Sequence, residues 1–296
     1  MTSTFNLKIT LFIKYLIPIL FFFVNVLLSV EGQEQTHDLF SDAPGEEPKI
    51  FGEGVVSVKD RYEYALSISP DGNQILFKAN DINGHYTLNK VDGKWNNPSE
   101  LKFREPSFWE YEAFFNSSGD KIYFTSRDSE ESGADHFYYA EKTDSGWSKG
   151  KFLDTRINRT QVMWCTFTAN DTMYYGNMLD FKIYSAKRTN RGFARPVNIG
   201  ITGMHPTVAP DESFILFNSS RLGGQGRHDL FVVFRNDDNS WSKPQNLGSQ
   251  INTDVSETCP TLSPDGNFLF FSRYNDQNGK SNIYWVDTSV IETIRP

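Results

Sequence analysis

The sequence predicts an all-β fold: a five-bladed β-propeller of four-stranded antiparallel blades, closed by an N-terminal strand. One hairpin motif recurs five times at intervals of ~50 residues, the usual length of a propeller blade. Each hairpin is followed by short segments rich in aromatic residues, which supply the remaining strands of a blade. The five hairpin turns begin at Ser69, Asn116, Thr168, Ala209 and Ser263.

Each hairpin consists of an apolar strand, a turn of the Ser-Pro-Asp-Gly type and a second strand rich in aromatic residues. In such a turn, Pro presets φ, Asp bonds back to its own backbone and Gly adopts the positive φ. Two strands joined by so tight a turn are antiparallel. The hairpins span residues 66–77, 113–124, 165–175, 206–217 and 260–271.

The remaining strands follow each hairpin. Third strands are expected at His85, His136, Phe181, Asp229 and Asn282. Fourth strands are expected around Trp95, Trp147, Phe193 and Trp241.

The fifth repeat has no fourth segment of its own. Residues 47–57 match the segment that precedes the last hairpin, beginning at Trp241. We therefore expect residues near 48–52 to form the outer strand of the blade built from 254–290. Such closure covers open sheet edges and completes the ring.

The hairpins also carry a family resemblance. The segments Ile68-Ser-Pro-Asp-Gly-Asn-Gln-Ile-Leu-Phe77 and Leu262-Ser-Pro-Asp-Gly-Asn-Phe-Leu-Phe-Phe271 resemble TolB-like β-propeller repeats, which are related to the WD family. The resemblance covers about residues 47–296, and the third repeat departs from it with Thr-Ala-Asn-Asp in its turn. It implies a secreted or periplasmic propeller, often a binding module. It implies no single activity, because propellers host many functions.

The first residues are expected to be a signal peptide over 1–32. Lys8 and Lys14 precede a largely apolar run from Tyr15 to Val30, which is shorter than the ~20 residues that a membrane-spanning helix needs. The alternative is an uncleaved anchor. With cleavage, the protein would have no stable membrane span and would be periplasmic or extracellular.

Two further segments complete the expected domain organisation. Residues 33–46 are expected to be a polar linker, and residues 47–296 a single propeller domain. Cys165 and Cys259 fall on strands of different blades, so we expect two buried free thiols.

Charge and motifs exclude several functions. With 29 basic and 37 acidic residues, the formal net charge is −8, which disfavours binding to nucleic acid. No pair of His or Cys residues has zinc-ligand spacing, and no phosphate-binding loop occurs. The sequence therefore predicts no metal and no cofactor.

The first strand of each blade lines the central channel of a propeller, so the candidate ligand-binding residues lie where these strands begin. Aligned on their turns, the repeats place three glutamates at one position and two tyrosines at the next, with a histidine facing them from blade 4. Blades 5, 1 and 2 are neighbours in a closed ring, so the glutamates are expected to form an acidic arc. The candidates are Glu63, Tyr64, Glu110, Tyr111, His205 and Glu257.

The recurring glutamates allow two interpretations. Carboxylates across a channel can act as general acid and base or bind a hard cation, and beside aromatic rings they suit sugars. Alternatively, a Glu that recurs in several repeats accepts hydrogen bonds from backbone N–H groups where blades meet. We assign no catalytic residue.

The function predicted is a binding or scaffold module for a protein or carbohydrate partner at the channel face. The alternative is a small glycan-active enzyme, similar to a glycoside hydrolase, that uses the channel carboxylates. Carboxyl pairs ~5–9 Å apart that face an open pocket would favour the enzyme. Carboxyls bonded to backbone amides would favour the binding module.

Overall fold

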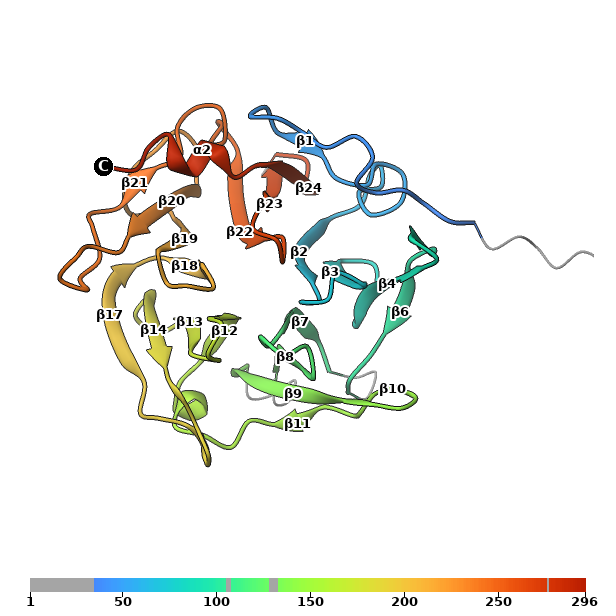
Figure 1. Ribbon diagram of the computed structural model, residues 1–296, viewed down its shortest axis with the longest axis horizontal. Helices are drawn as coiled ribbons and strands as arrows, with labels where there is room; N and C mark the ends of the chain where they lie inside the picture. The colour runs from blue at the N-terminus through green and yellow to red at the C-terminus, as the bar shows by residue number, and fades with distance from the viewer. Residues whose placement is uncertain (1–34, 105–107, 128–132, 276) are drawn as a thin grey trace, which may run out of the picture. The chain divides into compact units, whose positions relative to one another are not determined.

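The structure, a computed structural model, describes residues 35–104, 108–127, 133–275 and 277–296. The predicted signal peptide over 1–32 lies outside these residues. The chain divides into two units, 1–36 and 37–296. The second unit is the predicted five-bladed β-propeller of antiparallel four-stranded blades, seen in Figure 1 along the axis of the ring.

Each blade has four strands, ordered from the axis outward. Blade 1 contains β2 (Glu63–Ile68), β3 (Gln74–Ala79), β4 (His85–Val91) and β6 (Ser99–Leu101). Blade 2 contains β7 (Glu110–Phe115), β8 (Lys121–Arg127), β9 (Asp135–Thr143) and β11 (Lys151–Phe152). Blade 3 contains β12 (Val162–Phe167), β13 (Met173–Asn177), β14 (Lys182–Ala186) and β17 (Val197–Thr202).

The last two blades follow the same plan. Blade 4 contains β18 (Met204–Val208), β19 (Phe214–Ser219), β20 (Asp229–Phe234) and β21 (Gln245–Asn246). Blade 5 contains β22 (Ser256–Leu262), β23 (Phe268–Asn275), β24 (Lys280–Asp287) and the N-terminal β1 (Lys49–Ile50). Outside the blades lie the short strands β5 (Lys94–Trp95), β10 (Gly146–Trp147), β15 (Arg188–Thr189) and β16 (Gly192–Phe193), and the helices η1 (Ile157–Arg159) and α2 (Ser289–Glu292).

The turns form as their sequence predicts. In blade 5, the Asp265 carboxylate accepts hydrogen bonds from the Ser263 hydroxyl and from the backbone N–H of Asn267, at 2.5 and 3.1 Å. Gly266 follows with φ 75°. The turn of blade 1 repeats this arrangement, so each of these hairpins is set by local side-chain bonds.

The predicted ring closure is confirmed. Strand β1 pairs antiparallel with β24, with Lys49 opposite Trp285 and Ile50 opposite Tyr284. The next residue, Phe51, is fully buried, and its ring lies 5.0 Å from Phe270 and 5.2 Å from Trp285. Blade 5 therefore combines both ends of the propeller unit.

The expected fourth strands lie a few residues later than predicted. The aromatic residue instead forms a small hairpin arm with the third strand, as where Trp95 pairs with Lys90. The outer strand then begins after a proline in three blades, because proline has no N–H to donate to a ladder. The prolines are Pro98, Pro196 and Pro244, which precede β6, β17 and β21.

Residues 37–46, which fall in the expected polar linker, lie against blades 1 and 5. The backbone of His37 pairs with Trp95, and Leu39 is buried. The ring of Phe40 lies 6.1 Å from Trp95 and 5.6 Å from Trp285. This segment therefore covers the junction of the first and last blades.

Two further features complete the fold. Cys165 and Cys259 are buried free thiols on strands of different blades, as predicted. Within the described residues, the structure contains no helix with the length and apolar character that a membrane crossing requires.

Candidate functional site

Every inner strand contains a β-bulge near its start. The pairing of first and second strands shifts register in all five blades. Four of the bulge residues have positive φ although none is glycine: Ala65, Trp164, His205 and Cys259. A bulge changes the direction of the side chains beside it, and here these side chains fill the middle of the ring. Trp164 packs against Phe114 at 4.3 Å and against His205 at 5.0 Å.

Glu63 and Glu257 are bonded alike in neighbouring blades. The Glu63 carboxylate accepts hydrogen bonds from Arg61 Nε at 2.6 Å and from the backbone N–H of Val58 at 3.1 Å. The Glu257 carboxylate accepts from Arg273 Nε at 2.9 Å and from the N–H of Thr253 at 3.0 Å. Both residues are fully buried, and burial raises the pKa of Glu63 against the opposing effect of Arg61.

Glu110 is bonded to a loop and faces a histidine. It accepts hydrogen bonds from the backbone N–H groups of Phe103 and Arg104, at 2.9 and 2.5 Å. Its other oxygen lies 3.3 Å from His85 Nδ1, while His85 Nε2 faces the carbonyl of Tyr111. The buried His85 ring therefore lies between the Glu110 carboxylate and the backbone of Tyr111.

Each predicted glutamate therefore fixes its own loop. The three carboxylates bond to backbone amides, which is the arrangement that favours a binding module over an enzyme. Arg273 pairs with Glu257 within its own blade, because β22 and β23 are adjacent strands. Ligand binding by these three glutamates stays a prediction.

The other candidates lie in aromatic or buried surroundings. The Tyr64 ring is 5.2 Å from Tyr62, and burial raises its pKa well above the usual range. Burial also raises the pKa of Tyr111, near the guanidinium of Arg127. His205 Nδ1 lies 2.5 Å from the Asn218 side-chain oxygen, and burial lowers its pKa to about 4. His205 is therefore a neutral imidazole at neutral pH.

Sequence reasoning missed Glu112. This residue occupies the bulge position of blade 2, where the other blades have Ala, Trp, His or Cys. Its side chain is buried and, within the described residues, its Oε2 atom has no hydrogen-bond partner. Burial raises its pKa to about 7, although Lys78 opposes this shift. A carboxyl found at this position in one repeat alone was the signal in the sequence.

Lys78 is a buried cation whose charge opposes the rise in the pKa of Glu112. Its ammonium donates to the carbonyl oxygens of Ile82, Asn83 and Gly84, at 2.8, 2.9 and 2.6 Å. Burial lowers its pKa to about 8. Lys78 thus holds the loop between β3 and β4 of blade 1.

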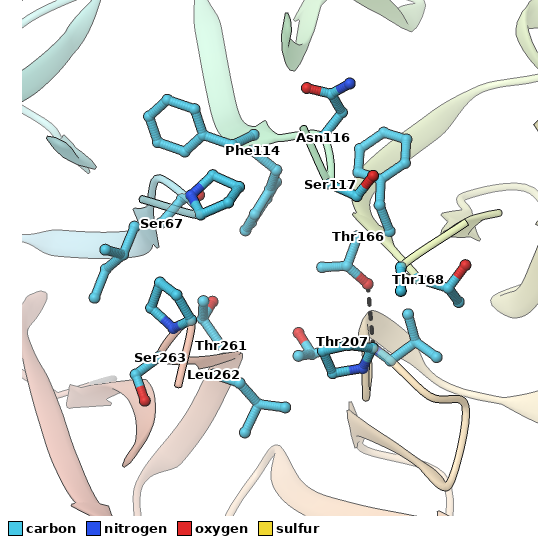
Figure 2. A pocket seen from close by; sticks show the side chains of 18 residues that line it. Ser67, Phe114, Asn116, Ser117, Thr166, Thr168, Thr207, Thr261, Leu262 and Ser263 are labelled. Carbon is cyan, nitrogen blue, oxygen red and sulfur yellow. Dashed lines mark hydrogen bonds between the residues drawn. The ribbon is translucent and has the colours of Figure 1, made fainter. Parts of the chain in front are cut away.

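A cavity of about 330 Å³ lies where the hairpin turns of all five blades converge; we call it the channel mouth. Figure 2 shows Ser67, Phe114, Thr166, Thr207 and Thr261 around it, one from each blade. None of the residues that line it is ionisable.

The hydroxyl groups of the channel mouth are only partly engaged. Thr166 Oγ1 donates to the Pro206 carbonyl at 2.9 Å and accepts from the N–H of Val208 at 3.2 Å. Thr261 Oγ1 is buried and, among the residues that the structure describes, has no partner. A ligand in this cavity would meet apolar walls and side chains that carry hydroxyl groups.

Comparison with known proteins finds similar structures but no similar sequences. No family model and no curated protein sequence matches the chain. A protein assigned as TolB from Agrobacterium tumefaciens has a similar structure, with a TM-score of 0.52 and 17% identity over 78% of each chain. A thermostable family-43 glycoside hydrolase matches with a TM-score of 0.51 and 12% identity, over 78% of this chain and 90% of that one. At these identities the likeness is one of fold, the β-propeller.

Proposed function

We propose that this protein is a non-catalytic binding propeller that holds a neutral part of a protein or carbohydrate partner in the channel mouth. The observation that carries the proposal is the lining of that cavity, which contains no ionisable side chain. General acid–base chemistry needs a titratable group within hydrogen-bond reach of the ligand. Binding needs only shape, apolar contact and a few polar groups, which this cavity provides.

The glutamates support the same function. Glu63, Glu110 and Glu257 are bonded to backbone amides and buried. Their carboxylates stabilise the loops that join the blades, so they contribute rigidity to the ring. A binding role is also what the resemblance to TolB-like repeats implies. The proposed location is the periplasm or the cell exterior, which rests on the signal peptide expected over 1–32.

The test obstructs the channel mouth. Ala169 is exposed on its rim, so Ala169→Trp should occlude the cavity. Asn190→Trp is the matched control, because Asn190 is exposed on the outer hairpin of the same blade. Both variants and the wild type are applied to peptide and glycan arrays. We expect Ala169→Trp to lose at least one ligand that the wild type and Asn190→Trp both bind. An array profile of Ala169→Trp identical to that of the wild type would contradict the proposal.

One observation favours a second function, a glycan-active enzyme. Burial raises the pKa of Glu112 to about 7, so this carboxyl holds a proton near neutral pH, as a general acid must. This alternative predicts that a bound glycan is shortened during incubation, and that Glu112→Gln stops the cleavage without unfolding the protein.

A further inference from the structure

A second cavity lies between blades 1 and 2, on the face that carries the hairpin turns. Its volume is about 570 Å³, within the range of small-ligand sites. Blade 1 contributes its turn and the middle of β4, and blade 2 contributes its turn and its small outer hairpin. This cavity, which we call the inter-blade pocket, is distinct from the channel mouth and shares with it only Phe115.

Trp147 forms a fixed wall of the inter-blade pocket. Its indole N–H donates to the Gln74 side-chain oxygen at 3.2 Å, and the Gln74 amide donates to Thr87 Oγ1 at 2.9 Å. The Phe115 ring lies 5.9 Å from Trp147. These contacts join the two blades and hold the indole in one orientation, which lowers the entropic cost of binding a ligand against it.

Trp147 also differs from its counterparts in the other outer hairpins, whose aromatic rings are covered by cations. The pairs are Lys90 over Trp95, Arg188 over Phe193 and Arg235 over Trp241, at 5.7, 5.1 and 3.8 Å. In the part of the chain that the structure describes, no cation stacks on Trp147. Lys142 occupies the position that corresponds to Lys90 and Arg188, and it lines the pocket as Lys90 does.

Polar groups of complementary kinds surround this wall. Asp71, Asn89, Lys90 and Lys142 all line the pocket and are exposed. The Ser69 hydroxyl holds the pKa of Asp71 below its usual range, so Asp71 is an anion at neutral pH. The pocket therefore offers a carboxylate acceptor, an amide that both donates and accepts, and two ammonium donors.

We propose that the inter-blade pocket is a carbohydrate-binding site. A sugar has hydroxyl groups that donate and accept hydrogen bonds and an apolar face of C–H groups that packs on an aromatic ring. The pocket matches both, since it has a rigid indole beside mixed donors and acceptors. A wholly apolar ligand would strip water from three charged groups without replacing their hydrogen bonds. This inference goes beyond the proposed function, because it concerns a separate cavity and a defined ligand class.

The experiment measures sugar binding by the full chain with isothermal titration calorimetry. A glycan array first ranks neutral and acidic sugars. The calorimetric probes are then maltotriose, chitotriose and trigalacturonate. Asn89→Ala and Lys142→Ala change exposed side chains and should keep the fold, which thermal melting checks. Each should weaken binding at least about fivefold, and Trp147→Ala should abolish it.

Matched controls remove the same groups elsewhere. Lys94→Ala and Asn190→Ala lie on exposed hairpin tips of blades 1 and 3 and should leave the dissociation constant unchanged. Ala169→Trp should also leave it unchanged, so failure of the channel-mouth proposal is separable from failure of this one. The inference is overturned if only peptides bind, if no sugar binds, or if sugar affinity is unaltered in both Asn89→Ala and Lys142→Ala. It is also overturned if Ala169→Trp alone removes sugar binding.

Discussion

Glu112 places a carboxyl group in the largely apolar middle of the ring. It lies at the bulge position, among residues such as Ala65, Trp164 and Cys259 that form the central cluster. A carboxylate without a hydrogen-bonded counter-ion is costly in such surroundings, so the protonated form is favoured. The folded protein therefore holds a proton there that the unfolded chain releases at lower pH.

This difference predicts a pH-dependent stability. The folded pKa of Glu112 is about 7, above the ordinary value of 4.5, so the folded state binds the proton more tightly. The stabilisation is complete below pH 4.5 and is lost as the pH rises through 7, by about 3 kcal/mol in total. Glu112→Gln should remove this slope and be more stable than the wild type at pH 7.5. Urea unfolding between pH 5 and 7.5 measures it.

The control for this prediction is Glu53→Gln, which changes an exposed glutamate and should follow the wild type. An identical pH dependence in the wild type and Glu112→Gln would show that Glu112 is not the group responsible.

The positions of the site residues could be predicted from the sequence, but their bonding partners could not. The repeat alignment correctly placed Glu63, Glu110 and Glu257 at equivalent positions, because each begins or lies near the start of an inner strand. Their bonding partners could not be predicted, since Val58, Phe103 and Thr253 belong to loops without a repeating pattern. Glu112 was missed because a strand pattern of alternating inward and outward side chains does not reveal where a β-bulge changes the direction of a side chain.

At the scale of elements, local chemistry decides which strands the sequence predicts. The Ser-Pro-Asp-Gly turns carry their own hydrogen bonds, so all five hairpins are predictable. The outer strands are not, because β11 and β21 have two residues each and are held by pairing with a neighbour. Such strands have no periodicity to detect, which explains their displacement from the predicted positions.

Closure by β1 is the element on which the ring depends most. Phe51→Ala should destabilise the protein by about 3–5 kcal/mol, because it leaves a cavity between Phe270 and Trp285. The control is Phe152→Ala on the outer strand of blade 2, where the side chain is 44% exposed and a smaller loss is expected. Equilibrium urea unfolding compares the two. A loss for Phe51→Ala no greater than that for Phe152→Ala would contradict a closing role for this segment.

At the scale of the whole propeller unit, the five blades build the channel mouth and the inter-blade pocket on the face of the hairpin turns. The central cluster packs Phe114 against Trp164 and bounds the channel mouth, since Phe114 belongs to both. The inter-blade pocket opens where Trp147 reaches from blade 2 to Gln74 of blade 1. The repeats predicted the ring, but these cavities arise from side chains that differ between repeats, so the sequence pattern alone did not locate them.

We propose that this propeller binds its ligand without changing it. The direct measurement is to incubate the tightest-binding array glycan or peptide with the full chain and with Glu112→Gln, and to weigh the recovered ligand by mass spectrometry. We predict that the ligand is bound by both proteins and recovered with unchanged mass. A ligand shortened by the wild type and left intact by Glu112→Gln would contradict the claim and establish a catalytic propeller.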